Sequence, residues 1–213
     1  MSEIIQLVRT LPIFPLPIVV FPGHLVPLHI FEYQYRAMMS DVLKSDKCFG
    51  ILRIDPKTGR LATTGCMIEI LEVDPLEDGR MNIEGIGRKR YELLKVVSDA
   101  PYIIAEVRLL PEFEPEPQAN SLADEVKQAL QEVIRLSGKL KPQSRLFSLQ
   151  EFPQDPEKLA FFVPATLYAS TEEQQKILEM NSVVERLQSE LEFCSTAVKY
   201  MAAVASLKDA FDK

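Results

Sequence analysis

The sequence predicts an α+β fold: a small β-barrel with one inserted helix, followed by a C-terminal helical bundle that ends in a long helix. Short apolar runs separated by turn residues fill the first half of the 213-residue chain, a pattern typical of a barrel. A stretch rich in Pro and Glu follows, and beyond it apolar residues recur at helical spacing. We therefore expect a barrel subdomain over 1–112, a linker over 113–120 and a helical subdomain over 121–213.

The strands expected in the first half are short, and prolines interrupt several of them. Because proline removes a ladder donor, the earliest segments fit an edge or rim better than a central strand. Apolar residues at helical spacing between positions 32 and 45 predict the inserted helix. The strands are expected at 11–16, 18–21, 25–30, 48–54, 65–73, 81–85, 90–97 and 102–110.

Start and stop signals delimit the helices that follow the linker. The first is expected over 121–136, ending near Gly138, and residues 139–155 are expected to form a loop. A further helix is expected over 157–168, where Pro164 should bend or interrupt it.

Two capping boxes, Thr171-x-x-Gln174 and Ser182-x-x-Glu185, predict two more helices. The last helix should be the longest, because its apolar residues from 184 to 205 alternate steps of three and four. That spacing is typical of a helix packed lengthwise against another.

Charge and cysteine usage limit the classes of function. The formal net charge of −7 disfavours a surface built for phosphate backbones. Cys48, Cys66 and Cys194 are far apart and include no C-x-x-C pair, so neither a disulfide framework nor a cysteine-rich zinc site is expected. The chain has no secretory signal pattern and no apolar run of about 18 residues. We therefore expect a cytoplasmic protein with no membrane segment.

The order of prolines and apolar residues near the N-terminus is specific. The segments are Leu11-Pro12-Ile13-Phe14-Pro15-Leu16, Val19-Val20-Phe21-Pro22-Gly23 and Val26-Pro27-Leu28-His29-Ile30. Together they resemble the opening signature of the amino-terminal domain of Lon proteases. Residues 83–91 resemble the glycine and arginine hairpin of that family, and residues 171–179 with 184–187 resemble its helical extension.

This resemblance covers nearly the whole chain and implies a PUA-like β-barrel followed by a helical bundle. In full-length Lon proteases this region engages substrate polypeptides. The sequence departs from the family at Pro17-Ile18, where a charged pair is usual. It also ends where a full-length protease would begin its ATPase, so the expectation is a domain present without ATPase and protease parts.

Groups for catalysis or metal binding are missing from the pattern. The sequence contains no G-x-x-x-x-G-K-[ST] string, which a P-loop needs. Ser195 and Lys199 are one helical turn apart but lack the glycine-flanked turn of a Ser-Lys dyad. His24 and His29 would point to opposite faces of a strand and have no third ligand. We therefore expect no enzymatic activity, no cofactor and no metal.

The leading hypothesis is a non-catalytic polypeptide-binding module that acts as an adaptor or a regulator of proteolysis. Its expected partners are unfolded or tagged polypeptides and a separate protease or chaperone. The candidate binding residues are Phe21, Leu25, Phe31 and Tyr33, near the proline-broken rim. Each of them also fits ordinary core packing.

The alternative hypothesis is an RNA-binding PUA-like module that uses a hairpin at Arg88, Lys89, Arg90 and Tyr91. Alternation of side chains along a strand would split these charges, and the protein as a whole is acidic. Phosphate contacts weaken steeply with salt whereas apolar capture does not, so salt dependence separates the two hypotheses.

Overall fold

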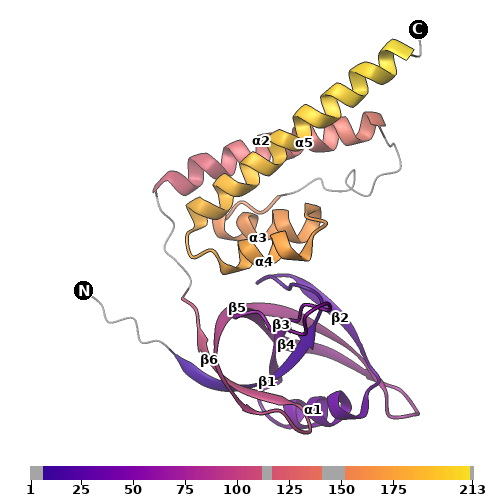
Figure 1. The fold of residues 1–213 in the computed structure, drawn as a ribbon, viewed down its shortest axis with the longest axis vertical. Helices are drawn as coiled ribbons and strands as arrows, with labels where there is room; N and C mark the ends of the chain where they lie inside the picture. Colours follow the sequence, from indigo (N-terminus) through magenta and orange to yellow (C-terminus); the bar gives the residue numbers. More distant parts are fainter. Residues whose placement is uncertain (1–6, 112–116, 141–151, 212–213) are drawn as a thin grey trace. The chain divides into compact units, whose positions relative to one another are not determined.

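The computed structural model describes residues 7–111, 117–140 and 152–211, which form six strands and five helices (Figure 1). The chain divides into two compact units. The first comprises Met1–Glu112 and Ala165–Glu179, and the second comprises Phe113–Pro164 and Met180–Lys213. Within the described ranges, none of the helices combines the length and the apolar character that crossing a membrane requires.

The first unit contains a six-stranded sheet that closes on itself through its longest strand. The strand order is β2-β5-β4-β3-β1-β6, and β5 also pairs with β6, so that five strands form a ring. β2 lies outside this ring and pairs with β5 alone among the described strands. The strands are β1 (Val8–Leu16), β2 (Leu25–Ile30), β3 (Cys48–Arg53), β4 (Thr64–Pro75), β5 (Met81–Ser98) and β6 (Ile103–Leu109).

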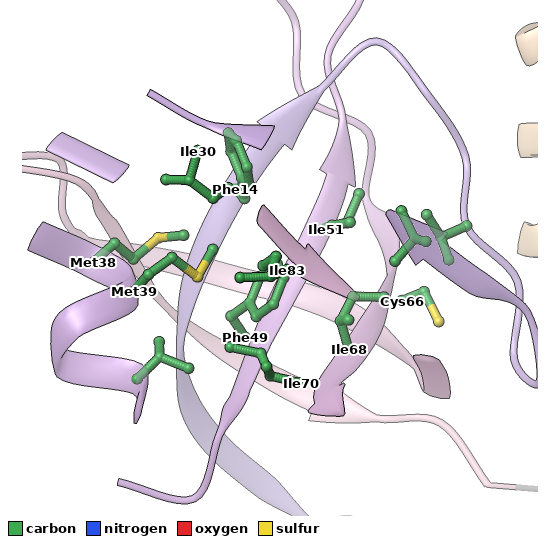
Figure 2. Close-up of a cluster of buried hydrophobic side chains, with 13 residues drawn as sticks. Phe14, Ile30, Met38, Met39, Phe49, Ile51, Cys66, Ile68, Ile70 and Ile83 are labelled. Atoms are coloured by element: carbon green, nitrogen blue, oxygen red, sulfur yellow. The ribbon is translucent and has the colours of Figure 1, made fainter. Parts of the chain in front are cut away.

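The inserted helix α1 (Tyr33–Lys44) confirms the prediction of a helix between β2 and β3. Its buried face supplies Met38, Met39 and Val42 to the core of the sheet. Figure 2 shows Met38 and Met39 directed from α1 toward side chains of the strands, among them Phe14 and Phe49. The α1 face therefore shields one end of the sheet's apolar interior.

Two of the expected strand assignments are wrong. Residues 18–21 do not form a strand, and the expected strands at 81–85 and 90–97 are parts of one continuous strand, β5. The hairpin predicted at Arg88 to Tyr91 is therefore absent, and those residues lie mid-strand. The register between β4 and β5 shifts between Met67 and Ile68, which leaves Arg88 as the extra residue of a β-bulge.

Gly87 allows a close approach of backbones and does not form a turn. A Cβ atom at this position would lie 2.2 Å from the carbonyl oxygen of Phe21. The glycine that suggested a hairpin is thus required because the 17–24 segment passes directly over β5.

Helix α2 (Pro117–Leu140) is longer than predicted at both ends. It begins at Pro117, inside the expected linker, because proline is well tolerated at the first helical position. Gly138 lies within the helix, whose buried face continues through Leu136 and Ser137. The expected loop over 139–155 falls mostly on residues 141–151, which lie outside the described ranges.

The remaining helices are α3 (Pro156–Leu167), α4 (Thr171–Glu179) and α5 (Val183–Phe211). Pro164 lies inside α3 without ending it. The capping box at Ser182 is confirmed in its first half, since the Glu185 N–H donates to Ser182 Oγ at 3.2 Å. The cap of α4 is Ser170 and not Thr171, because the Glu173 N–H donates to Ser170 Oγ at 3.4 Å.

The long last helix is confirmed, and in the second unit α2 and α5 lie side by side along their length (Figure 1). Their contact is apolar at most positions, as the steps of three and four predicted. Two charged residues of α5, Arg186 and Glu190, are also fully buried, which the sequence pattern did not indicate.

Candidate functional site

A pocket of about 300 Å³ opens in the first unit, beside the start of β2. Most of its wall comes from the 17–24 segment and from β2, and the rest comes from Ala165 at the end of α3 and Gln174 of α4. Every lining residue belongs to the first unit, so the pocket is a feature of that unit alone. The lining residues are Ile18, Val19, Val20, Phe21, His24, Leu25, Val26, Pro27, Ala165 and Gln174.

The 17–24 segment is held in place by backbone hydrogen bonds to β5. The Gly23 N–H donates to the Gly87 carbonyl at 2.8 Å, and the Gly87 N–H donates to the His24 carbonyl at 2.9 Å. Gly23 has a φ of 81°, in the left-handed region that glycine tolerates best. The wall of the pocket is thus fixed by the backbone, and its shape does not depend on one side chain.

Helix α4, on the other side of the pocket, is fastened to the sheet by polar contacts. Gln175 Nε2 donates to the Thr64 carbonyl at 3.0 Å, and Arg90 Nη1 donates to the Leu178 carbonyl at 2.8 Å. The Arg90 cation therefore lies at the carboxyl end of α4, where the helix dipole favours positive charge. These bonds position the helix that carries Gln174.

The four predicted polypeptide-binding residues do not lie in one patch. Phe21 is 1% exposed and forms part of the core, packing edge to face with His24. Leu25 and Phe31 are 57% and 59% exposed, and Leu25 lines the pocket. Tyr33 is 78% exposed at the start of α1, with the Arg36 guanidinium 5.8 Å from its ring centroid.

Leu25 and Phe31 belong to one face of β2 and its continuation. Burial alternates along the strand, so that Val26 and Ile30 face the core while Leu25, Pro27 and His29 are exposed. The ring of His29 stacks on Phe31 with centroids 6.0 Å apart. An exposed row that is mainly apolar therefore extends from the pocket along an edge strand.

Sequence reasoning missed the parts of this site that come from other segments. Ile18 and Pro27 could have been found, since both lie in the proline-rich opening and Pro27 falls on the exposed phase of the strand alternation. Gln174 had no such signal, because its place in the pocket depends on how α4 packs against the sheet.

The basic cluster is divided by its place in β5. Arg88 is exposed and forms an ion pair with Glu69 at 2.6 Å, and Lys89 is also exposed. Arg90 is buried under α4, and Tyr91 is fully buried with its hydroxyl donating to the Ile51 carbonyl at 3.1 Å. Burial raises the pKa of Tyr91 well above its usual value. Its ring is not available for stacking on a base.

Groups suited to catalysis or metal binding do not converge in the described part of the chain. No cluster of three or more His, Cys, Asp or Glu side chains there could hold a metal ion. His29 Nδ1 lies 2.7 Å from Asn82 Oδ1. Burial raises the pKa of Cys66 to about 12, which keeps it a thiol. Ser195 and Lys199 lie on α5, half-buried and exposed respectively.

Comparison with known proteins assigns a family to this arrangement. Residues 10–196 match the model of the ATP-dependent protease La (LON) substrate-binding domain. The Lon protease of Flavobacterium johnsoniae is 26% identical over 91% of this chain, and that of Azospirillum brasilense is 28% identical over 83%. The chain spans about a quarter of the length of these relatives, 25% and 23% respectively.

Two solved structures share the fold. The Lon N-terminal domain protein from Xanthomonas campestris superposes with a TM-score of 0.65 at 21% identity, covering 86% of this chain and 98% of that one. The N-terminal domain of the Lon protease from the Mycobacterium avium complex gives the same TM-score at 19% identity, covering 88% and 98%. The mixed fold of six strands and five helices in the described ranges is therefore that of Lon N-terminal domains.

Proposed function

Because the chain belongs to the family of Lon substrate-binding domains, we propose that it is a non-catalytic module that binds other polypeptides. The closed ring of five strands supports a PUA-like barrel for the first unit. The lengthwise packing of α2 and α5 supports a helical bundle for the second. We place the binding site on the first unit.

One observation carries this proposal: the pocket opens onto an exposed, mainly apolar row along an edge strand. Leu25 contributes to both, and Phe31 ends the row. The pocket and the adjoining row both expose apolar surface. Covering this surface with a partner is favourable, because apolar groups are removed from water. An edge strand also offers backbone groups to an extended chain. Unfolded or tagged polypeptides present both apolar side chains and free backbone groups.

The proposed role is that of an adaptor or regulator of proteolysis in the cytoplasm, where the three free thiols of Cys48, Cys66 and Cys194 are stable. The module would bring captured polypeptides to a separate protease or chaperone. No chemical step is assigned to its own residues.

The test is binding of a permanently unfolded, fluorescently labelled model protein, followed by anisotropy. The double variant Leu25→Ser/Phe31→Ser should weaken binding about tenfold, since it removes two apolar anchors. The control is Val96→Ser/Val97→Ser, whose side chains are 45% and 55% exposed in the distal half of β5. It should bind as the parent protein does.

Salt separates this function from the RNA alternative. Capture of unfolded protein should persist from low to high salt, apart from a minor charge contribution. Saturable binding of single-stranded RNA that collapses with salt and is lost in Arg88→Ala/Lys89→Ala, without capture of unfolded protein, would overturn the proposal.

A further inference from the structure

We propose that the polypeptide recognised here is an extended, basic and apolar segment that adds to the sheet as a new strand along β2. This inference rests on the proposed function and names the class of ligand for the same surface. It commits to three features of the ligand: an extended backbone, an apolar side chain for the pocket, and a lysine or arginine beside Pro27.

The backbone of β2 points half of its polar groups away from the sheet. The Gly87 N–H donates to the His24 carbonyl, and the next pair in the register is Leu25 with Ile86. In an antiparallel ladder, hydrogen-bonded and non-hydrogen-bonded pairs alternate. Leu25 and Ile86 are thus a non-hydrogen-bonded pair, and the N–H and C=O groups of Leu25 point to the open edge.

The same alternation puts Pro27 and His29 in the outward-pointing class. Pro27 has no N–H, so the open edge offers the donors of Leu25 and His29 and the carbonyls of all three residues. One missing donor weakens a strand contact without preventing it. The edge therefore suits a ligand that binds reversibly.

The pocket identifies an apolar side chain as one part of the ligand. It adjoins Leu25, at the end of the edge where the first outward N–H and C=O groups lie. A strand paired with Leu25 would place a side chain on the same face as the Leu25 side chain. Ile18 and Val19 supply further apolar wall at that point.

Charge identifies the other part of the ligand. Glu84 of β5 lies directly opposite Glu72 of β4, and both are exposed. Like charges in directly opposed positions destabilise a sheet. No salt bridge between described residues reaches either carboxylate. Two neighbouring acids do have partners, Glu69 with Arg88 and Asp74 with Asn82.

Glu72 and Glu84 lie in the cross-strand row that ends at Pro27 on the open edge. Pro27 is the register partner of Glu84, so Pro27, Glu84 and Glu72 form one row across three strands. A residue of an added strand opposite Pro27 would lie about 10 Å from Glu84, two strand spacings away. Lysine and arginine side chains can extend across the small proline toward this carboxylate.

A second copy of this chain fits the edge poorly. Pairing of two β2 strands would bring together two rows that each carry Glu72 and Glu84. The net charge of −7 adds to this repulsion, and Pro27 would leave a missing donor on both sides. A basic partner experiences the same charges as attraction.

The experiment uses three synthetic peptides and the full chain. The first alternates valine with lysine on one face, the second replaces each lysine by glutamate, and the third is the lysine peptide with alternate backbone nitrogens methylated. The lysine peptide should bind at low salt, and the other two should bind at least about tenfold more weakly, since they lose charge attraction or strand hydrogen bonds.

Matched variants connect the effect to the named residues. Glu72→Gln/Glu84→Gln should weaken the lysine peptide about fivefold, because it removes the carboxylate nearest the lysine, Glu84, and the further negative charge of Glu72 beside it. Glu125→Gln/Glu192→Gln changes the net charge equally, at exposed positions of the second unit, and should have little effect. Pro27→Val restores an outward N–H and should strengthen binding.

The outcomes distinguish this inference from the proposed function. Equal binding of the lysine and glutamate peptides, or indifference to backbone methylation, would overturn the strand-and-charge inference. The proposed function would survive that result if unfolded protein still bound and Leu25→Ser/Phe31→Ser still weakened it. A self-associated parent chain in analytical ultracentrifugation would overturn the assignment of the edge to a foreign ligand.

Discussion

The two units treat their buried polar side chains differently. In the first unit, Arg90, Tyr91 and Gln175 each donate at least one hydrogen bond to a backbone carbonyl of another element, at 2.8, 3.1 and 3.0 Å, although Gln175 Oε1 has no hydrogen-bond partner among the described residues. In the second unit, Arg186 and Glu190 are fully buried on α5. Both carboxylate oxygens of Glu190 and both Nη atoms of Arg186 lack a hydrogen-bond partner among the described residues.

The buried polar groups therefore have different consequences in the two units: they specify structure in the first and lower stability in the second. Hydrogen bonds to fixed carbonyls specify one arrangement of strands and helix, which a pocket walled by several segments requires. Burying an ionisable side chain without a hydrogen-bond partner lowers stability, whether the group stays charged or becomes neutral through a shifted pKa. Arg186 is partly supported, because its Nε donates to the Met180 carbonyl and its guanidinium lies 4.4 Å from the Phe161 ring centroid. Among the described residues, the attraction of Arg186 is what offsets the burial of Glu190.

The largest effect on stability is expected for Arg90→Met, which tests whether a buried hydrogen bond holds α4 on the sheet of the first unit. The variant leaves the buried Leu178 carbonyl without its charged donor, so the free energy of unfolding should fall by about 2–3 kcal/mol. The matched control is Arg88→Met, two residues away on the same strand. Arg88 and Glu69 are both nearly half exposed, so this control should cost less than about 1 kcal/mol.

Urea denaturation followed by circular dichroism measures both variants. Equal effects of Arg90→Met and Arg88→Met would show that the buried hydrogen bond does not specify the position of α4. The contrast between the two units would then lose its main support.

A smaller effect is expected for Gly87→Ala, which tests whether the backbone fixes the pocket wall. The new methyl group would collide with the Phe21 carbonyl, and overpacking of this kind costs about 1–3 kcal/mol. Hydrogen exchange should accelerate at Gly23, whose N–H donates to Gly87, and capture of unfolded protein should weaken.

The control for this variant is Gly59→Ala. Gly59 has a φ of 69° and open space around it, so the substitution strains a turn by about 1–2 kcal/mol without touching the pocket. Binding should be unchanged. Unaltered exchange at Gly23 in Gly87→Ala would mean that the segment adjusts freely and that the wall is not fixed.

Local signals in the sequence were sufficient for most elements of the fold. Periodicity located α1 and α5, and Ser182 marked the start of α5, because these features depend on residues within a turn or two of one another. The resemblance added the family, and with it the mixed fold.

Long-range packing explains what the sequence did not reveal. Gly87 resembled a turn residue, but its lack of a side chain serves a segment more than sixty positions earlier in the chain, at Phe21. Arg90 and Tyr91 resembled an exposed basic and aromatic cluster, but α4 and the closed sheet bury them. Glu190 lies outside the apolar spacing that predicted the buried face of α5, yet the folded second unit buries it completely.

The smallest effect is expected for Glu190→Gln, which tests the second unit. Burial raises the pKa of Glu190 well above its usual value, with Arg186 only partly opposing the shift. The folded state therefore retains this proton at pH values where the unfolded state has lost it. Stability should fall as pH rises from the unfolded pKa of about 4.3 toward the raised folded value, by at most about 1.4 kcal/mol per pH unit.

Glutamine cannot ionise, so Glu190→Gln should remove this slope and raise the free energy of unfolding at neutral pH by about 1 kcal/mol. Thermal denaturation of the variant and the parent chain between pH 5 and pH 8 measures both the pH slope and the stability at neutral pH. This range is chosen because it lies above the unfolded pKa of the glutamate, where the folded and unfolded states differ in protonation. Glu192→Gln, an exposed neighbour on α5, should leave the slope unchanged. Destabilisation by Glu190→Gln would instead identify Glu190 as an ionised partner of Arg186. In that case the second unit would depend on a specific buried pair, just as the first depends on Arg90.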